Sequence, residues 1–185
     1  TDAAQNTGTA SQVLTIGTKD AGGVITGGGG PGGGGGPGVG ADPRYRPDAE
    51  IRQVKGVFVG QGSYDVSDQR VTSKLKGHAK SVTFEVRLTN RGDSADRMAV
   101  TGTGRNAQFN VTYFAGGVNV TRSVLDGTYR TDALKSDESA TLTVKVTKHR
   151  GARPGSTRTF RIHVVSAHAD NKDDTVAAVV RAARG

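Results

Sequence analysis

The stretch Ser81-Val82-Thr83-Phe84-Glu85-Val86-Arg87-Leu88-Thr89 decides the fold class of this chain. Apolar residues occupy every even position of the stretch between two polar ends, and polar residues occupy every odd position. Side chains along a β-strand point alternately to the two faces of a sheet. The pattern therefore predicts a strand with one face in a hydrophobic core and the other in water.

The same alternation recurs on both sides of this stretch. It is clear at residues 141–147 and 159–164, and weaker at residues 51–59, 97–101, 109–114, 118–125 and 175–180. Gly, Pro, Asn and Asp punctuate the intervals, as they do in turns. Valine outnumbers leucine 22 to 6, which suits a pleated sheet. These features predict an all-β protein with an antiparallel β-sandwich, although the alanines of residues 176–184 leave a short helix open as an alternative there.

A set of positions resembles the immunoglobulin-like repeats of bacterial extracellular and surface proteins. The resemblance spans about residues 50–181 and is carried by the run Phe84–Asp93, then Asp96, Val100-Thr101-Gly102, Tyr113-Phe114, Asn119-Val120-Thr121, Gly127-Thr128-Tyr129 and Leu134. It implies a single immunoglobulin-like β-sandwich that serves as a secreted, non-catalytic spacer, adhesive or assembly module. It brings no catalytic residues to this chain.

The distribution of apolar residues divides the chain into three parts. Of 37 Leu, Ile, Val and Phe residues, 31 lie in residues 49–185. Residues 22–40 contain 13 Gly and two Pro, a composition typical of a flexible linker. We therefore expect an N-terminal tail at residues 1–21, a Gly/Pro-rich linker at residues 22–48 and the sandwich at residues 49–185.

The tail carries one short β-branched run that has no partner strand nearby. Within Ser11–Thr18, the residues Val13, Leu14, Thr15 and Ile16 are the predicted subunit interface. We expect this strand to add itself to an open sheet edge of a neighbouring molecule. Head-to-tail contacts of this kind do not close and generate fibres. The alternative is that the tail is a disordered remnant of secretion.

Charge suggests a second class of function. Residues 49–185 hold 22 basic and 13 acidic side chains, a net charge of +9. An anionic cell-surface glycan or envelope polymer is therefore an alternative partner, with the domain acting as a binding module. Nucleic acid is not expected, because the basic residues are spread over the chain and the aromatic residues lack the spacing of a stacking platform.

The sequence predicts no catalytic, cofactor-binding or metal site, and the chain is expected not to be an enzyme. It has no Gly-x-Ser-x-Gly elbow and no glycine-rich loop that opens a helix.

One calcium candidate remains in a predicted strand connection, where oxygen ligands gather at Asp170, Asn171, Asp173 and Asp174. The four histidines are expected at the surface. Arg91-Gly92-Asp93 is interpreted as an exposed turn rather than an integrin-ligand tripeptide.

Location follows from the same features. No run of 18 apolar residues is present, so no membrane span is expected. The first residue is Thr, which fits the removal of a leader. We expect a secreted protein of the bacterial cell surface, a structural subunit of an extracellular filament or surface layer.

Overall fold

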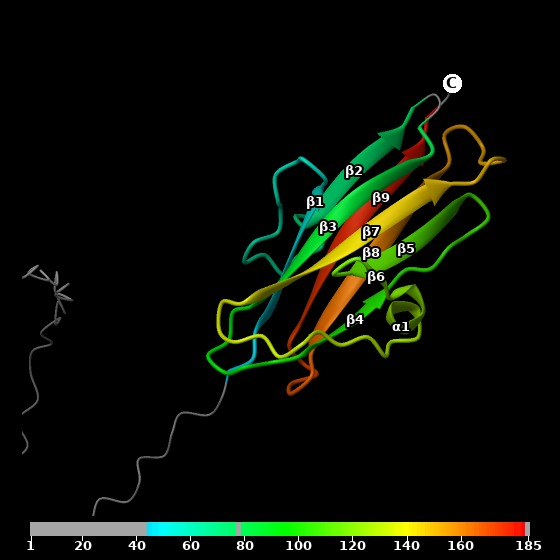
Figure 1. Ribbon diagram of the computed structural model, residues 1–185. Helices are drawn as coiled ribbons and strands as arrows, with labels where there is room; N and C mark the ends of the chain where they lie inside the picture. Colours follow the sequence, from blue (N-terminus) through cyan, green and yellow to red (C-terminus); the bar gives the residue numbers. More distant parts are fainter. Residues whose placement is uncertain (1–43, 77–78, 184–185) are drawn as a thin grey trace, which may run out of the picture. The chain divides into compact units, whose positions relative to one another are not determined.

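The computed structural model describes residues 44–76 and 79–183, which form two β-sheets packed face to face (Figure 1). One sheet has the order β1 (Pro47–Gln53), β3 (Ser81–Asn90), β7 (Ser139–Lys148), β5 (Phe109–Ala115) and β6 (Val118–Asn119). The other has the order β2 (Arg70–Leu75), β9 (Asp173–Ala182), β8 (Thr157–Ser166) and β4 (Met98–Gly102). All strand pairs are antiparallel except β2 with β9. The predicted all-β sandwich is confirmed.

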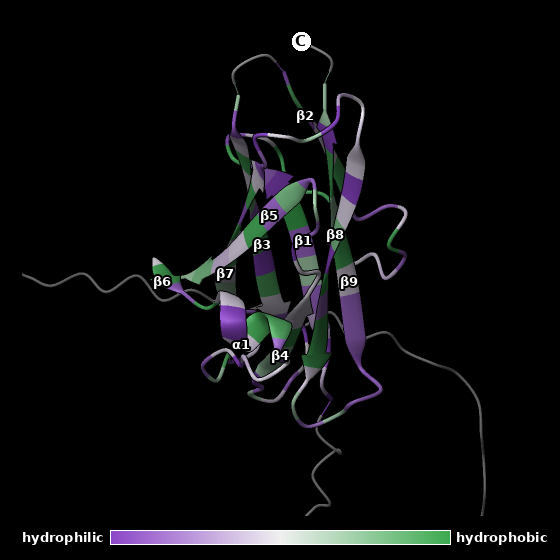
Figure 2. Ribbon diagram, turned by 90° about the vertical axis from the view of Figure 1, so that its right-hand side faces the viewer, coloured by the Kyte–Doolittle hydropathy of each residue, from purple (hydrophilic) through white to green (hydrophobic). Residues whose placement is uncertain are grey.

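The core lies where the inner faces of the two sheets meet. Polar and apolar residues alternate along β3 (Figure 2), where Val82, Phe84, Val86 and Leu88 are buried as predicted. Thr89, which the alternation placed toward water, is buried as well. Val86 of β3 lies opposite Leu142 of β7, and both are fully buried. Phe109 and Phe160 join the two sheets with an edge-on ring contact, 6.5 Å between centroids. This packing follows directly from the alternation in the sequence.

The strand order reproduces that of a constant-type immunoglobulin sandwich. The run β1-β3-β7-β5 corresponds to strands ABED, and β4-β8-β9 corresponds to strands CFG. The segment after β1 leaves the first sheet, and β2 then joins the second sheet beside β9 in parallel. The strand β2 was not predicted. Its six residues alternate polar and less polar types only weakly.

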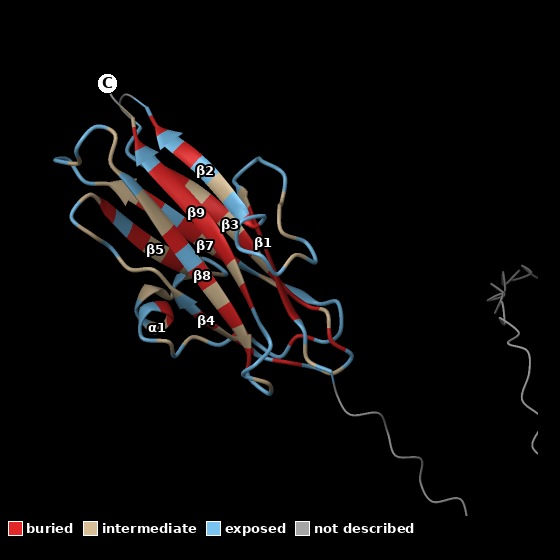
Figure 3. Ribbon diagram, turned by 180° about the vertical axis from the view of Figure 1, so that it is seen from behind, coloured by how far each residue is buried: buried red, intermediate tan, exposed pale blue. Residues whose placement is uncertain are grey.

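Two further segments differ from the sequence-based expectation. Residues 118–125 do not form one strand but the two-residue β6 and the short helix α1 (Thr121–Leu125). The Asn119 side chain accepts a hydrogen bond from the Thr121 N–H at 3.0 Å, and this local turn ends the strand. Residues 176–182 belong to a strand rather than a helix, and β9 is largely buried because β2 and β8 flank it (Figure 3).

The compact unit that contains the described residues runs from Ala41 to Gly185. Its first strand begins at Pro47, two residues before the boundary predicted for the sandwich. Within the part of the chain that the structure describes, no helix has the length and apolar character needed to cross a membrane.

Candidate functional site

The predicted interface residues Val13, Leu14, Thr15 and Ile16 lie outside the described residues. What the structure describes is the surface on which such a strand would dock, namely the outer edges of the two sheets. An outer edge accepts an added strand only where its backbone N–H and C=O groups have no partner.

The outer edge of β1 is capped by the segment that follows it. Ile51 and Val59 exchange two backbone hydrogen bonds, at 2.9 and 3.0 Å. The Ala49 N–H donates to Oδ2 of Asp174 at 2.7 Å. Pro47 has no N–H to offer. This edge is closed to an added strand.

The outer edge of β4 is closed by residues 129–134. Val100 N–H donates to the Tyr129 carbonyl at 3.1 Å, and Thr131 N–H donates to the Met98 carbonyl at 3.0 Å. The Thr131 hydroxyl also accepts the Met98 N–H at 3.0 Å. Farther along, Asp96 and Leu134 exchange two backbone hydrogen bonds.

Beyond β5 the sheet continues only with the two-residue β6, which pairs with Phe114 and Ala115 in the described part of the chain. The remaining outer edge of β5 is closed at both ends. Phe109 exchanges hydrogen bonds with Asn106, whose side chain accepts the Phe109 N–H at 2.8 Å. Tyr113 N–H donates to the Thr121 hydroxyl at 2.9 Å, and the Tyr113 carbonyl accepts the Val120 N–H at 2.9 Å. Between these two caps, the length of β5 whose outward backbone groups stay unpaired is little more than one residue.

The outer edge of β2 is open. The carbonyls of Gln69 and Leu75 accept hydrogen bonds from Ala177 and Ala183, so the odd-numbered residues face β9. Backbone groups alternate in direction along a strand, and those of Arg70, Thr72 and Lys74 therefore point away from β9. These three residues are exposed, and no described residue forms a backbone hydrogen bond with them on that side. We call these outward groups the β2 edge.

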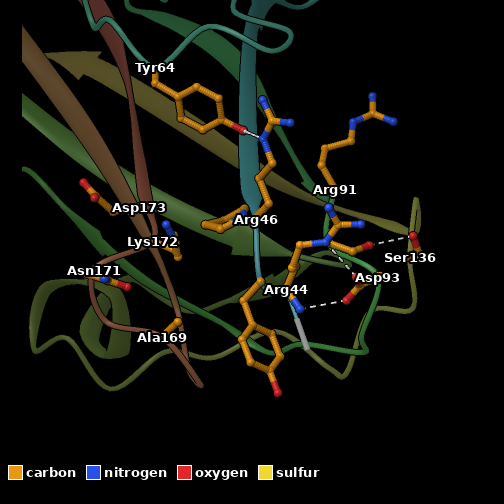
Figure 4. Close-up of a pocket in the computed structure, with 13 residues that line it drawn as sticks. Arg44, Arg46, Tyr64, Arg91, Asp93, Ser136, Ala169, Asn171, Lys172 and Asp173 are labelled. Atoms are coloured by element: carbon orange, nitrogen blue, oxygen red, sulfur yellow. Dashed lines mark hydrogen bonds and ion pairs between the residues drawn. The ribbon is translucent and has the colours of Figure 1, made fainter. Parts of the chain in front are cut away.

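A second candidate site is a pocket of about 840 Å³ beside the start of β1 (Figure 4). Four separate parts of the chain build most of it: the lead-in residues 44–47, Tyr64 from the β1–β2 connection, the turn after β3, and the β8–β9 connection with the first residue of β9. Ser136 also lines the pocket, beside that turn. Four cationic side chains contribute to its wall, namely Arg44, Arg46, Arg91 and Lys172. We call this space the arginine pocket.

The turn Arg91-Gly92-Asp93 forms one wall of the arginine pocket. Asp93 accepts hydrogen bonds from the N–H of Arg44 at 2.7 Å and from its Nε at 2.9 Å, and these bonds hold the pKa of the Asp93 carboxyl below its usual value. Arg91 pairs with Asp137 at 2.8 Å. Gly92 is buried, and a Cβ there would collide with the Arg44 carbonyl. The turn is thus fastened to the domain, whereas the sequence indicated an exposed turn.

Arg46 and Tyr64 meet on the opposite side of the lead-in residues. The Arg46 Nε donates a hydrogen bond to the Tyr64 hydroxyl at 2.7 Å. Burial is the main reason why the pKa of Tyr64 is raised, so its hydroxyl stays protonated near neutral pH and keeps its own hydrogen to donate. Neither Arg46 nor Lys172 forms an ion pair with a carboxylate of the described residues.

The calcium candidates do not converge. Asp174 is buried and accepts hydrogen bonds from Ala49, Gln69 and Thr175, while Asp173 lies 3.7 Å from the His163 ring. Asn171 lines the arginine pocket and Asp170 is exposed. Among the described residues, no three His, Asp or Glu side chains are grouped as metal ligands. The positions of these four side chains therefore do not support a calcium site that they share.

A histidine contact near the same pocket was not foreseen from the sequence. The Nδ1 atom of His168 lies 2.8 Å from the buried carboxylate of Asp96, and the ring stacks on Tyr45 at 5.0 Å. The two residues are 72 positions apart, so no local pattern could reveal the contact. In the described part of the chain, no serine or threonine hydroxyl is hydrogen-bonded to the His168 ring. The contact anchors the lead-in residues to the β8–β9 connection.

Comparison with known proteins finds similar structures only. No family model and no curated protein matches the sequence. The VesB protease of Vibrio cholerae is 17% identical over 61% of this chain and 30% of its own, with a TM-score of 0.38. The N-terminal domain of PorA is 12% identical over 72% of this chain and 96% of its own, with a TM-score of 0.46. The pilin subunit BcpA of Bacillus cereus is 15% identical over 77% of this chain and 41% of its own, with a TM-score of 0.38. These likenesses concern β-rich architecture and assign no activity.

The comparisons correct one expectation. From the sequence the chain is expected not to be an enzyme, whereas the similar structures include hydrolases. Besides the VesB protease they include the secreted serine protease VesC from Vibrio cholerae and a family 123 glycoside hydrolase from Clostridium perfringens, at 11% and 10% identity. The chain spans 22% of the former and 27% of the latter. The exclusion of enzymes is therefore withdrawn.

Proposed function

We propose that this chain is an exported structural subunit of an extracellular filament or surface layer, built from an immunoglobulin-like module. In this assembly the tail strand Val13–Ile16 of one subunit pairs with the β2 edge of the next. The observation that carries the proposal is the state of the edges: in the described residues the edges of β1 and β4 are capped and that of β5 nearly so, while the β2 edge is open.

The β2 edge offers an added strand a row of backbone partners. Arg70, Thr72 and Lys74 present their N–H and C=O groups along one side of a six-residue strand. Main-chain hydrogen bonds of this type provide affinity, and side chains on the inward face provide specificity. In the proposed pairing Leu14 and Ile16 continue the apolar row that β2 begins with Val71 and Leu75.

The length of the chain before the domain is compatible with exchange between subunits. Residues 17–43 separate the tail strand from Arg44, and a fully extended chain of that length spans roughly 90 Å. A six-residue strand is about 20 Å long. The same length also reaches the β2 edge of its own domain, so the experiment must separate the two arrangements.

The test is a proline placed on the β2 edge. Thr72→Pro removes one outward N–H, because that group does not bond to β9, and proline is tolerated on an edge strand. Thr72→Val keeps the N–H and is the matched control. We expect the intact chain and Thr72→Val to form filaments under negative-stain imaging. Thr72→Pro and a chain lacking residues 1–20 should stay monomeric and folded.

Several outcomes would overturn the proposal. If Thr72→Pro assembles like the intact chain, the β2 edge is not the acceptor. If the chain lacking residues 1–20 assembles normally, the tail is not the donor. If the intact chain is monomeric at every concentration tested, subunit exchange does not occur. A Leu14→Asp and Ile16→Asp pair should reproduce the effect of the deletion, because it places charge on the inward face of the added strand.

A second candidate function is attachment to an anionic cell-surface polymer. The net charge of +9 in residues 49–185 favours it, and so do the cations Arg46 and Lys172 in the arginine pocket. An intact chain with this function is retained on a polyuronate matrix and released by salt, because salt screens charge attraction. Passage through the matrix at low salt would exclude it.

A further inference from the structure

The geometry points to the arginine pocket as a site for a carboxylated sugar, a uronic acid unit of an acidic saccharide. This inference rests on the second proposed function, attachment to an anionic polymer, and it assigns that function to one place on the domain. The pocket volume of about 840 Å³ lies within the range of small-ligand sites and accommodates a few linked sugar rings.

The wall of the arginine pocket carries more positive than negative charge. The pocket wall holds four cations against two carboxylates, Asp93 and Asp173. Arg44 is engaged with Asp93 at 2.9 Å, and Arg91 is engaged with Asp137 and Asp48 outside the wall. Arg46 and Lys172 are left without an ion-pair partner among the described residues. The pocket is therefore short of negative charge, and a ligand carboxylate supplies it.

Arg46 and Tyr64 also provide hydrogen-bond donors to a ligand in the pocket. The Arg46 guanidinium uses its Nε on Tyr64 and keeps its terminal NH₂ groups for a ligand. The Tyr64 hydroxyl accepts that bond and retains its own hydrogen. Figure 4 shows Tyr64 and Arg46 meeting at one end of the pocket, with the Ala169–Asp173 group along one side. A carboxylate bound here meets donors from two different parts of the chain.

The rest of the wall suits a sugar better than a bare anion. Tyr45 stacks on His168 with one face, and the Arg46 guanidinium lies over the Tyr64 ring at 5.2 Å. Each ring keeps one flat apolar face, on which the C–H face of a pyranose ring can lie. Asn171, Ser136 and Asp93 add polar groups of both donor and acceptor type for ring hydroxyls. The two carboxylates of the wall would repel a second negative charge. This favours one carboxylate per sugar over a phosphate or a densely acidic peptide.

The site is held in place before a ligand arrives. Tyr45 is stacked on His168, whose Nδ1 contacts the buried Asp96 carboxylate at 2.8 Å. The β8–β9 connection is closed by a hydrogen bond from Ser166 N–H to the Lys172 carbonyl at 2.9 Å. Such support reduces the entropy that binding must overcome.

The test uses trigalacturonate as the probe and the full chain as the protein. Binding is measured by calorimetry for the wild type and for the double variant Arg46→Gln, Lys172→Gln. The matched control is Arg122→Gln, Lys145→Gln, which removes the same charge from two exposed positions that do not line the pocket. We expect the pocket variant to bind at least tenfold more weakly and the control to stay within about twofold of the wild type. Methyl-esterified trigalacturonate and penta-glutamate serve as comparison ligands and should bind at least tenfold more weakly than the acid sugar.

The possible results distinguish a failure of the arginine pocket as the binding site from a failure of polymer attachment as the function. Equal weakening in both double variants means that net charge alone drives binding and overturns the inference. Equal binding of penta-glutamate overturns the assignment to a sugar. If the wild type is retained on polygalacturonate beads and the pocket variant is retained equally, the site is wrong while polymer attachment stands. If trigalacturonate binds in the pocket but the beads retain nothing, the inference stands and polymer attachment fails. If neither probe is bound, both fail.

Discussion

At the scale of single residues, buried acids hold together parts of the chain that are distant in sequence. Asp174 is 2% exposed and accepts hydrogen bonds from Ala49 N–H at 2.7 Å and from the Gln69 amide at 2.6 Å. Burial removes water from the carboxylate and raises its pKa above the ordinary value of 3.8, although the hydrogen bonds act in the opposite direction. The same residue therefore caps the edge of β1 and binds its proton more tightly in the folded state than in the unfolded state.

We expect Asp174→Asn to change how stability depends on pH. A raised folded-state pKa means that the proton on Asp174 stabilises the fold, that this contribution is complete below about pH 4, and that it is lost as pH rises through the folded pKa. The free energy of unfolding of the wild type should therefore fall relative to that of Asp174→Asn as the pH rises above about 4. Urea unfolding at several pH values checks this. The exposed neighbour Asp170, changed to Asn, is the control, and a difference that does not vary with pH would contradict the assignment.

At the scale of elements, the edges determine which surfaces remain available. The strand β4 is protected by residues 129–134, whereas β2 has a single partner strand, β9, on one side. Exposed edges invite pairing with other chains, and natural sheets commonly shorten, charge or cover them. Here β2 is short and carries Arg70 and Lys74, yet its backbone stays accessible. The open edge is thus restricted in length rather than blocked.

One side-chain hydroxyl takes part in the cap on β4, beside the backbone hydrogen bonds. Thr131 is 2% exposed, and its hydroxyl accepts the Met98 N–H at 3.0 Å. Thr131→Val preserves shape but leaves that buried N–H without a partner, which destabilises the fold by about 1–3 kcal/mol. Thr141→Val, on the exposed face of β7, should leave stability within about 0.5 kcal/mol of the wild type. Chemical denaturation measures both. An unchanged midpoint for Thr131→Val would show that Met98 finds another acceptor.

At the scale of the whole molecule, the described residues contain a hydrophobic core to which both sheets contribute. The fully buried side chains include Phe84, Tyr113, Phe109 and Phe160, which come from both sheets. Each of these side chains is fully buried by other residues of the sandwich. The stability of the domain is therefore expected to reside in residues 44–185.

A chain that begins at Arg44 should fold by itself. Its free energy of unfolding should lie within about 0.5 kcal/mol of that of the intact chain, since the buried core of the described residues is retained in full. Circular dichroism and urea unfolding at low protein concentration provide the comparison. A loss of more than about 2 kcal/mol would indicate instead that the tail packs on its own domain, because only removal of buried contacts has an effect of that size.

Much of the fold was accessible from the sequence alone. The alternation in β3, β7 and β8 predicted their strands, and the confirmed all-β sandwich followed from their number and from the turns between them. The strand β2 was missed because Val71, Ser73 and Leu75 form a weak apolar row, and because its partner β9 lies about a hundred residues away in a parallel pair. The prediction for residues 118–125 was wrong because a local Asn119 turn overrode the strand pattern.

Neither candidate site could be predicted in this way. The open state of the β2 edge depends on what covers β1, β4 and β5, and the arginine pocket joins Arg46, Tyr64 and Lys172 from three separate connections. Strand periodicity is a property of neighbouring residues, since it follows from the geometry of the extended backbone, and the amino-acid order therefore determined the strands and the faces they bury. Which edge stays unpaired and which cations share a pocket depends on contacts between residues far apart along the chain, and only the folded arrangement of the two sheets decided them.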